Sequence, residues 1–215
     1  MTTSTRRTPG RGPGRPSLTE RRKQDTRTEV SRAAARLFIE RGYDATTVED
    51  IAAASGMALR TFYRYFRAKE ETIVPLFAAG TRDWVRRLTE ADAAEGLVDA
   101  LLSSYRGSVR HARAAEGVDE DQLRTLLRMM EAHPALRAVW LNVYRDTEDR
   151  LCPAIAARVG APEDALEVRL AAGTVNTAVR IAMERWAAGD ASSRSADEAV
   201  ARALRMIADG GLLAG

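Results

Sequence analysis

Apolar residues recur at helical spacing along almost the whole chain from about residue 20 onward. Between residues 20 and 41, Val30, Leu37 and Phe38 fall on one stripe, and Gly42 follows directly as a helix stop signal. No stretch alternates apolar and polar residues as a half-buried strand does. The pattern therefore predicts an all-α fold whose first helix spans residues 20–41.

Two short helices are predicted after Gly42. Thr47 is a suitable N-cap for the second helix, and Asp50 three residues later nearly completes a capping box. That helix ends near Ser55 and Gly56, and the third helix covers residues 58–66. Two short helices joined by a tight, glycine-containing turn, with a longer helix across them, are typical of a helix-turn-helix unit.

The remaining pattern predicts longer helices. The fourth helix runs from Lys69 to about Leu88, which places Pro75 beyond its first turn and predicts a kink there. Pro153 is expected to kink the longest of the later helices in the same way. Glycine and proline residues place those later helices at about 96–112, 119–131, 134–159, 162–188 and 195–213.

The third helix has two chemically different faces. At 100° per residue, Phe62 and Phe66 point to one side, and Arg60 and Arg64 point to the other. The apolar side suits packing against the other helices. The guanidinium groups on the opposite side suit a DNA major groove, although a solvated charged face is the common alternative.

Charge is distributed unevenly along the chain. Residues 1–70 carry fifteen basic and eight acidic side chains, whereas the whole chain has a net charge of only +3. A basic head on a mildly acidic body predicts contact with a polyanion, either nucleic acid or an anionic membrane. No apolar run of about 18 residues is present, so no membrane span is expected. The single cysteine, Cys152, excludes an intramolecular disulfide and fits a cytoplasmic location.

The segment AARLFIERGYDATTVEDIAAASGMALRTFYRYFRAKEE resembles the DNA-binding domain of the TetR family of transcriptional regulators. The resemblance extends from Thr28 to about Phe77, roughly a quarter of the chain. It implies a three-helix DNA-binding domain at residues 19–68, after a disordered basic arm at residues 1–18. It also implies a larger helical effector-binding and dimerisation domain at residues 69–215.

The resemblance assigns roles to residues of the helix-turn-helix unit. Thr47 would cap the second helix and touch a phosphate, and Tyr65 and Lys69 would bind backbone phosphates. Tyr65 stands where the family often has histidine, and Ala68 stands where it often has a serine cap; a tyrosine can still donate to a phosphate. The residues expected to face the groove, with Arg64 added from the helical projection, are Leu59, Arg60, Thr61, Tyr63 and Arg64.

The stretch GPGRPS at residues 12–17 resembles a minor-groove arm of the AT-hook type. Arg15 would then enter a narrow A·T groove. The alternative is a disordered basic tail that adds only salt-sensitive, non-specific affinity.

Wide apolar coverage marks the last two helices, which need partners on more than one side. This is similar to the family's four-helix dimer interface, so we expect a homodimer through these helices. A two-fold dimer predicts a palindromic double-stranded DNA operator.

The family's C-terminal domain usually encloses an effector pocket. The candidates by residue type are Trp84, Tyr105, Met130, Trp140, Tyr144, Asn176 and Met183, with Met129 and Cys152 as further possibilities. Each of these also fits an ordinary core position. Asn176 is of interest because it is polar within an apolar helix, and buried polar groups need partners.

No motif for catalysis, a metal or a cofactor is found. His111 and His133 are isolated, and no phosphate-binding loop follows a strand. We therefore expect a ligand-responsive repressor rather than an enzyme, with an unknown small-molecule effector, no cofactor and no membrane partner. The alternatives are an effector-independent architectural DNA-binding protein, or an all-α small-molecule-binding protein or enzyme.

Overall fold

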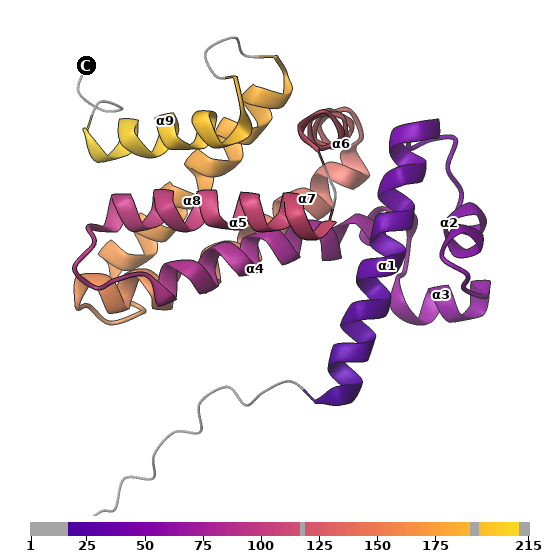
Figure 1. Cartoon of the computed structure of the whole chain (residues 1–215), viewed down its shortest axis with the longest axis horizontal. Helices are drawn as coiled ribbons and strands as arrows, with labels where there is room; N and C mark the ends of the chain where they lie inside the picture. The colour runs from indigo at the N-terminus through magenta and orange to yellow at the C-terminus, as the bar shows by residue number, and fades with distance from the viewer. Residues whose placement is uncertain (1–16, 117–118, 190–193, 211–215) are drawn as a thin grey trace, which may run out of the picture.

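The computed structural model describes residues 17–116, 119–189 and 194–210. Within these ranges every regular element is helical, which confirms the all-α prediction (Figure 1). Arg15 and the rest of residues 1–16 lie outside the described part of the chain.

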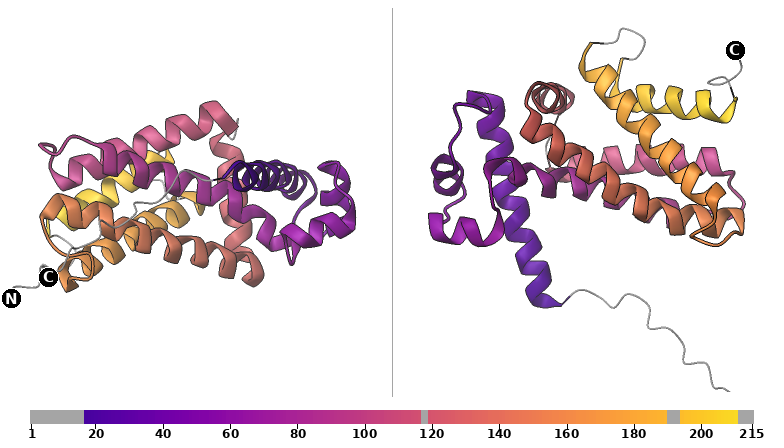
Figure 2. Two further views of the ribbon diagram at one scale, coloured as in Figure 1. Left: turned by 90° about the horizontal axis from the view of Figure 1, so that it is seen from below. Right: turned by 180° about the vertical axis from the view of Figure 1, so that it is seen from behind.

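Three helices form one end of the molecule: α1 (Leu18–Arg41), α2 (Val48–Ala54) and α3 (Leu59–Tyr65). Seen from behind in Figure 2, they lie together at one side, with α1 crossing between α2–α3 and the rest of the protein. The cap of α2 and the end of α1 follow the sequence signals, whereas α1 begins at Leu18, two residues earlier than predicted. Ser17 accepts the Glu20 backbone N–H at the start of α1, and Thr47 and Asp50 form a complete capping box on α2. Gly42 has a φ of 84°, a region that favours glycine, and this ends α1.

The predicted kink at Pro75 is wrong. Residues Lys69–Ile73 form a separate 3-10 helix, η1, and α4 (Val74–Glu90) begins only after it. Pro75 therefore lies in the first turn of α4, where its missing N–H has no helical acceptor to lose.

Five further helices form the larger body: α5 (Leu97–Glu116), α6 (Glu120–Ala132), α7 (Pro134–Val159), α8 (Leu166–Ala187) and α9 (Ala196–Ala208). Helix α8 begins four residues later than predicted, because residues 162–165 form a turn closed by the Ala165 N–H and the Pro162 carbonyl at 3.1 Å. Pro153 lies inside α7, which continues through it; a bend there stays a prediction.

Helix α4 links the two parts, because it packs against α1 at one end and against α5 and α7 along its length. Helix α6 also contacts α1. The boundary expected between residues 68 and 69 remains a prediction.

Candidate nucleic-acid interface and ligand cavity

Helix α3 presents one buried and one exposed face. Phe62 and Phe66 are fully buried, with ring centroids 5.5 Å apart, so the helix is anchored by its apolar side. On the other side Arg60 and Arg64 are exposed, Tyr63 is 53 % exposed and Leu59 is 39 % exposed. The division follows the predicted helical phase. Thr61 is half-buried at the margin between the two faces.

Thr47 uses its polar groups within its own helix cap. Its hydroxyl donates to Asp50 Oδ2 at 2.7 Å and accepts the Asp50 N–H at 3.1 Å, and its backbone N–H also donates to Oδ2 at 3.0 Å. The Thr47 N–H is the main cause that lowers the pKa of Asp50, which keeps that carboxylate charged. A phosphate contact by Thr47 therefore stays a prediction, and it would take place beside a negative charge.

Lys69 has a structural role that the sequence did not reveal. Its ammonium donates to the backbone carbonyls of Tyr43 at 2.7 Å and Thr46 at 2.9 Å, and lies 4.1 Å from the centre of the Tyr43 ring. These contacts tie η1 to the turn between α1 and α2. The predicted phosphate contact depends on the remaining ammonium N–H.

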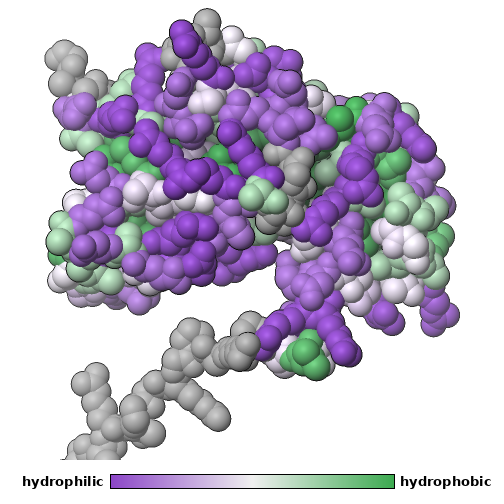
Figure 3. Space-filling model, in the orientation of Figure 1, coloured by the Kyte–Doolittle hydropathy of each residue, from purple (hydrophilic) through white to green (hydrophobic). Residues whose placement is uncertain are grey.

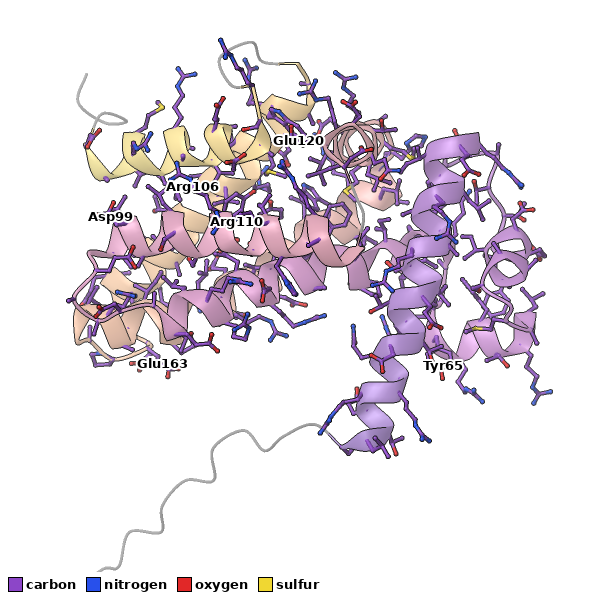
Figure 4. The ribbon with its side chains drawn as sticks, viewed as in Figure 1. Tyr65, Asp99, Arg106, Arg110, Glu120 and Glu163 are labelled. Carbon is purple, nitrogen blue, oxygen red and sulfur yellow. The ribbon has the colours of Figure 1, made fainter. Side chains whose placement is uncertain are left out.

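Tyr65 and Arg27 lie together at the end of α3. Arg27 donates to the Tyr65 backbone carbonyl at 3.2 Å and stacks 4.9 Å from the centre of the Phe66 ring. The Tyr65 side chain is half-buried and near the end of α3 in Figure 4. The sequence did not predict the role of Arg27, because its hydrogen bond to Tyr65 joins residues 38 positions apart and no local pattern indicates it.

The hydropathy of the surface differs between α1 and the helices beside it. In Figure 3 the viewer-facing side of α1 is mostly hydrophilic, whereas pale and green residues gather over α2 and α3 at the right. The exposed side of the helix-turn-helix unit thus mixes apolar groups with cations.

His133 joins the body to the helix-turn-helix unit. It is both the last cap of α6 and the first cap of α7. Its ring lies 4.9 Å from the Tyr43 ring, and Nε2 is 3.4 Å from Asp44 Oδ2. The Tyr43 hydroxyl donates to Glu70 Oε2 at 3.3 Å, and burial, followed by Glu70, raises the pKa of Tyr43 to about 12. The turn after α1 is thus held by α6–α7 on one side and by η1 on the other.

A cavity of about 250 Å³ lies in the body between α4, α5, α6, α7 and α8. Five of the predicted ligand residues line it: Trp84, Tyr105, Trp140, Tyr144 and Met183. The prediction missed several lining residues, among them Phe77, Ser108, Val109, Leu123, Leu126 and Val179. Phe77 lies two helical turns before Trp84, a spacing from which its position was predictable.

Met130 and Asn176 do not line this cavity. Met130 is buried in the core beside it. Asn176 donates through Nδ2 to the Tyr144 carbonyl at 2.8 Å and so supports a lining residue from behind, while its Oδ1 has no hydrogen-bond partner within the described residues. Met129 and Cys152, the weaker candidates, also lie outside the lining; the Cys152 thiol donates to the Glu148 carbonyl at 3.4 Å.

An exposed apolar strip follows α8 and reaches α9. Leu170 is 60 % exposed, Ile181 is 47 % exposed, and Met206 of α9 is 45 % exposed. These three residues line a groove between the two helices. Leu166, at 71 %, is more exposed still but lies outside the groove. The prediction of wide apolar coverage on the last two helices agrees with this surface.

Among the described residues, no cluster of three or more His, Cys, Asp or Glu side chains is arranged to hold a metal ion. No helix in this part of the chain has the length and apolar character needed to cross a membrane.

The fold and these surfaces define a DNA-binding regulator with a helix-turn-helix unit and a helical body. A model of the bacterial regulatory proteins of the TetR family matches residues 31–73, and a model of the MftR C-terminal domain matches residues 95–211. The chain belongs to the TetR family, and it is a DNA-binding transcriptional regulator.

Relatives support this placement over most of their length. The transcriptional regulator TcmR of Streptomyces glaucescens is 34 % identical over 188 residues, which cover 86 % of this chain and 81 % of TcmR. The putative mycofactocin biosynthesis transcriptional regulator MftR of Mycobacterium tuberculosis is 27 % identical over 196 residues, covering 88 % of this chain and 93 % of MftR. Both relatives are regulators of transcription.

A solved structure shows the same fold. Thermus thermophilus FadR, a TetR-family repressor in complex with lauroyl-CoA, superposes with a TM-score of 0.56 at 23 % identity, over 88 % of this chain and 96 % of FadR.

Proposed function

We propose that this protein is a ligand-responsive repressor that binds a palindromic operator as a homodimer in the cytoplasm. The observation that carries the proposal is the face of α3, where Arg60, Tyr63 and Arg64 are exposed above a buried Phe62 and Phe66. Guanidinium groups on a rigidly anchored helix suit base edges in the major groove. Tyr65, Lys69 and Thr47 are the proposed phosphate contacts, with Arg15 of the N-terminal arm as a further proposed contact.

The dimer would form through α8 and α9. Leu170, Ile181 and Met206 expose apolar surface along one groove, and apolar strips of this kind mark protein interfaces. A two-fold axis through this surface would carry two α3 helices to successive major grooves of one operator.

The effector would occupy the cavity between α4 and α8, and its signal would travel through α4 and α6. Helix α6 contributes Leu123 and Leu126 to the cavity wall and ends at His133, whose ring packs on Tyr43. The turn at Tyr43 leads directly into Thr47, the cap of α2. A ligand that favours one position of α6 therefore favours one position of the helix-turn-helix unit, which is a shift between two populations.

The test is selection of bound sequences from a random DNA pool, followed by fluorescence anisotropy on the selected site and on a scrambled site. We expect a palindromic consensus and a specificity ratio of about 10³ or more at fixed salt. A ratio near one at that salt concentration would instead support the architectural alternative. Absence of any salt-dependent DNA binding would support the small-molecule-binding or enzyme alternative.

A further inference from the structure

Two phenol hydroxyls in the cavity wall lack a strong acceptor. Tyr105 on α5 and Tyr144 on α7 both line the cavity and are 8 % and 6 % exposed. The Tyr105 hydroxyl donates only to the sulfur of Met183, at 3.2 Å, and a thioether is a weak acceptor. Within the described part of the chain, the Tyr144 hydroxyl has no hydrogen-bond partner. Neither hydroxyl has a strong acceptor in the protein, so both can donate to an acceptor on a ligand.

The other donors of the aromatic wall are already engaged. Trp84 Nε1 donates to the Leu101 carbonyl at 3.3 Å, and Trp140 Nε1 donates to Glu184 Oε1 at 3.2 Å. The Ser108 hydroxyl donates to the Tyr105 backbone carbonyl at 2.8 Å. Among the donors of the aromatic wall, the two phenols therefore remain for a ligand, and the His111 ring also lines the cavity.

Both rings are held in place by their surroundings. Tyr105 packs edge-on against Trp84 with centroids 5.6 Å apart, and Tyr144 packs edge-on against Trp140 at 4.6 Å. The Asn176 amide fixes the backbone of Tyr144 from behind. Donors held in this way lose little conformational freedom when a ligand binds.

Burial also determines the protonation of the pair. It is the main cause that raises the pKa of Tyr105, and it raises the pKa of Tyr144 well above the ordinary value, with Tyr105 as the next cause. Both phenols stay protonated at neutral pH and act as hydrogen-bond donors.

Among the described lining residues, the cavity offers no unpaired guanidinium or ammonium group to an anionic ligand. Arg113, the arginine among its described lining residues, is paired with Glu120. Asp83 at the rim is paired with Arg86 and Arg87. A charged ligand group would enter an aromatic, apolar wall without compensation, which is unfavourable.

We infer that Tyr105 and Tyr144 together bind the oxygen of a carbonyl group on an otherwise apolar, uncharged effector. The inference rests on the proposed effector cavity and names the chemistry that the cavity recognises. The carbonyl oxygen has two lone pairs and accepts from both phenols, while the remainder of the ligand contacts Phe77, Trp84 and Trp140.

The test compares fluorenone with fluorene, which share one tricyclic skeleton and differ in a single carbonyl group. Binding of each probe to the full-length protein is measured by equilibrium dialysis. We expect fluorenone to bind about tenfold more tightly than fluorene or better, since two added hydrogen bonds contribute. The double variant Tyr105→Phe, Tyr144→Phe should lose this preference while its affinity for fluorene stays unchanged.

The matched control is Ser104→Ala, which removes a buried hydroxyl from α5 outside the cavity lining. It should keep the preference for fluorenone, and circular dichroism melting curves check that every variant is folded. Equal binding of the two probes to the wild type overturns the inference, as does a preference that survives in the double variant. Tighter binding of fluorene-carboxylate than of fluorenone overturns the uncharged class.

Operator binding, measured separately, distinguishes this inference from the proposed function. If neither probe binds while the protein recognises its operator, the phenol site is refuted and the regulator remains. If the protein discriminates the probes as expected but shows no preference for any DNA sequence, the phenol site stands and the repressor proposal fails.

Discussion

The exposed faces of α3 and α8 both carry large apolar side chains, but they differ in whether the neighbouring arginines form ion pairs. On α3, Leu59 and Tyr63 lie beside Arg60 and Arg64, and within the described residues neither arginine forms an ion pair. On α8, Arg169 beside Leu170 is paired with Asp149 at 3.0 Å and with Glu148 at 3.5 Å. The unpaired guanidinium groups favour a polyanion, whereas an apolar strip beside a paired arginine favours another apolar surface.

The largest effect on operator affinity is expected from disrupting the exposed apolar surface of α8. Leu170→Glu places a charge in the groove and should convert the dimer to a monomer. Operator affinity should then fall by about 100-fold or more, because the second half-site contact is no longer linked to the first. Sedimentation equilibrium and anisotropy on the selected operator measure the two effects.

Leu166→Glu is the matched control, since Leu166 is more exposed but lies outside the groove. It should leave the protein dimeric. A dimeric Leu170→Glu variant with normal operator affinity would contradict the role of this face.

The variant Arg60→Ala tests whether the exposed face of α3 reads bases. If Arg60 reads a base edge, the change should cost about 1–3 kcal/mol on the selected operator and relax the preference at one base position. Anisotropy on operators with single base substitutions gives this preference. An equal loss on every sequence would make Arg60 a phosphate contact instead.

Arg106→Ala is the control for Arg60. Arg106 is an exposed arginine on α5, and Figure 4 shows it at the side of α5 that faces α9, far from the labelled Tyr65. Its loss should leave the base preference unchanged.

Lys69→Ala tests how far the phosphate contacts also hold the fold. Two backbone carbonyls lose their donor, so we expect the free energy of unfolding to fall by about 1–2 kcal/mol, together with a uniform loss of DNA affinity. Urea denaturation measures the first and anisotropy the second. Lys23→Ala, an exposed lysine on α1, should keep full stability; an equally stable Lys69→Ala variant would leave the residue a DNA contact alone.

The smallest effect is expected from the titration of Tyr43. Its pKa is raised to about 12 in the fold, above the usual value of about 10 in an unfolded chain. Below pH 10 both states keep the proton, and the contribution to stability is complete. As the pH rises toward 12 only the unfolded state releases the proton, so the free energy of unfolding falls.

Urea denaturation between pH 9 and about 12 measures this slope. Tyr43→Phe removes the titrating group, and its curve should therefore be flatter over that interval. Parallel curves for the two proteins would show that Tyr43 titrates alike in both states.

Local signals predicted the helix-turn-helix unit well. Thr47 and Asp50 are three residues apart and cap one helix, Gly42 ends another, and the phase of Phe62 and Phe66 depends on helical geometry alone. Pro75 was misplaced because a 3-10 helix and an α-helix have similar local patterns, and only the hydrogen bonds separate them.

Contacts between residues that are far apart in the chain could not be predicted from the sequence. The bonds from Lys69 to Tyr43 and Thr46 cross more than twenty residues, and the described cavity wall takes side chains from six helices. Residue type identified most of its aromatic members, yet Asn176 lies outside the lining and donates to the Tyr144 carbonyl. Which face of a long helix borders a void depends on how all its neighbours pack.

His133 is both the C-cap of α6 and the N-cap of α7, and Pro134 follows it as the first residue of α7. A proline there has no N–H to bond backward, so α7 has no way to lengthen into α6. The connection between α6 and α7 is therefore a single residue. Under the proposed mechanism, a tilt of α6 at the cavity end would therefore displace the imidazole that packs on Tyr43.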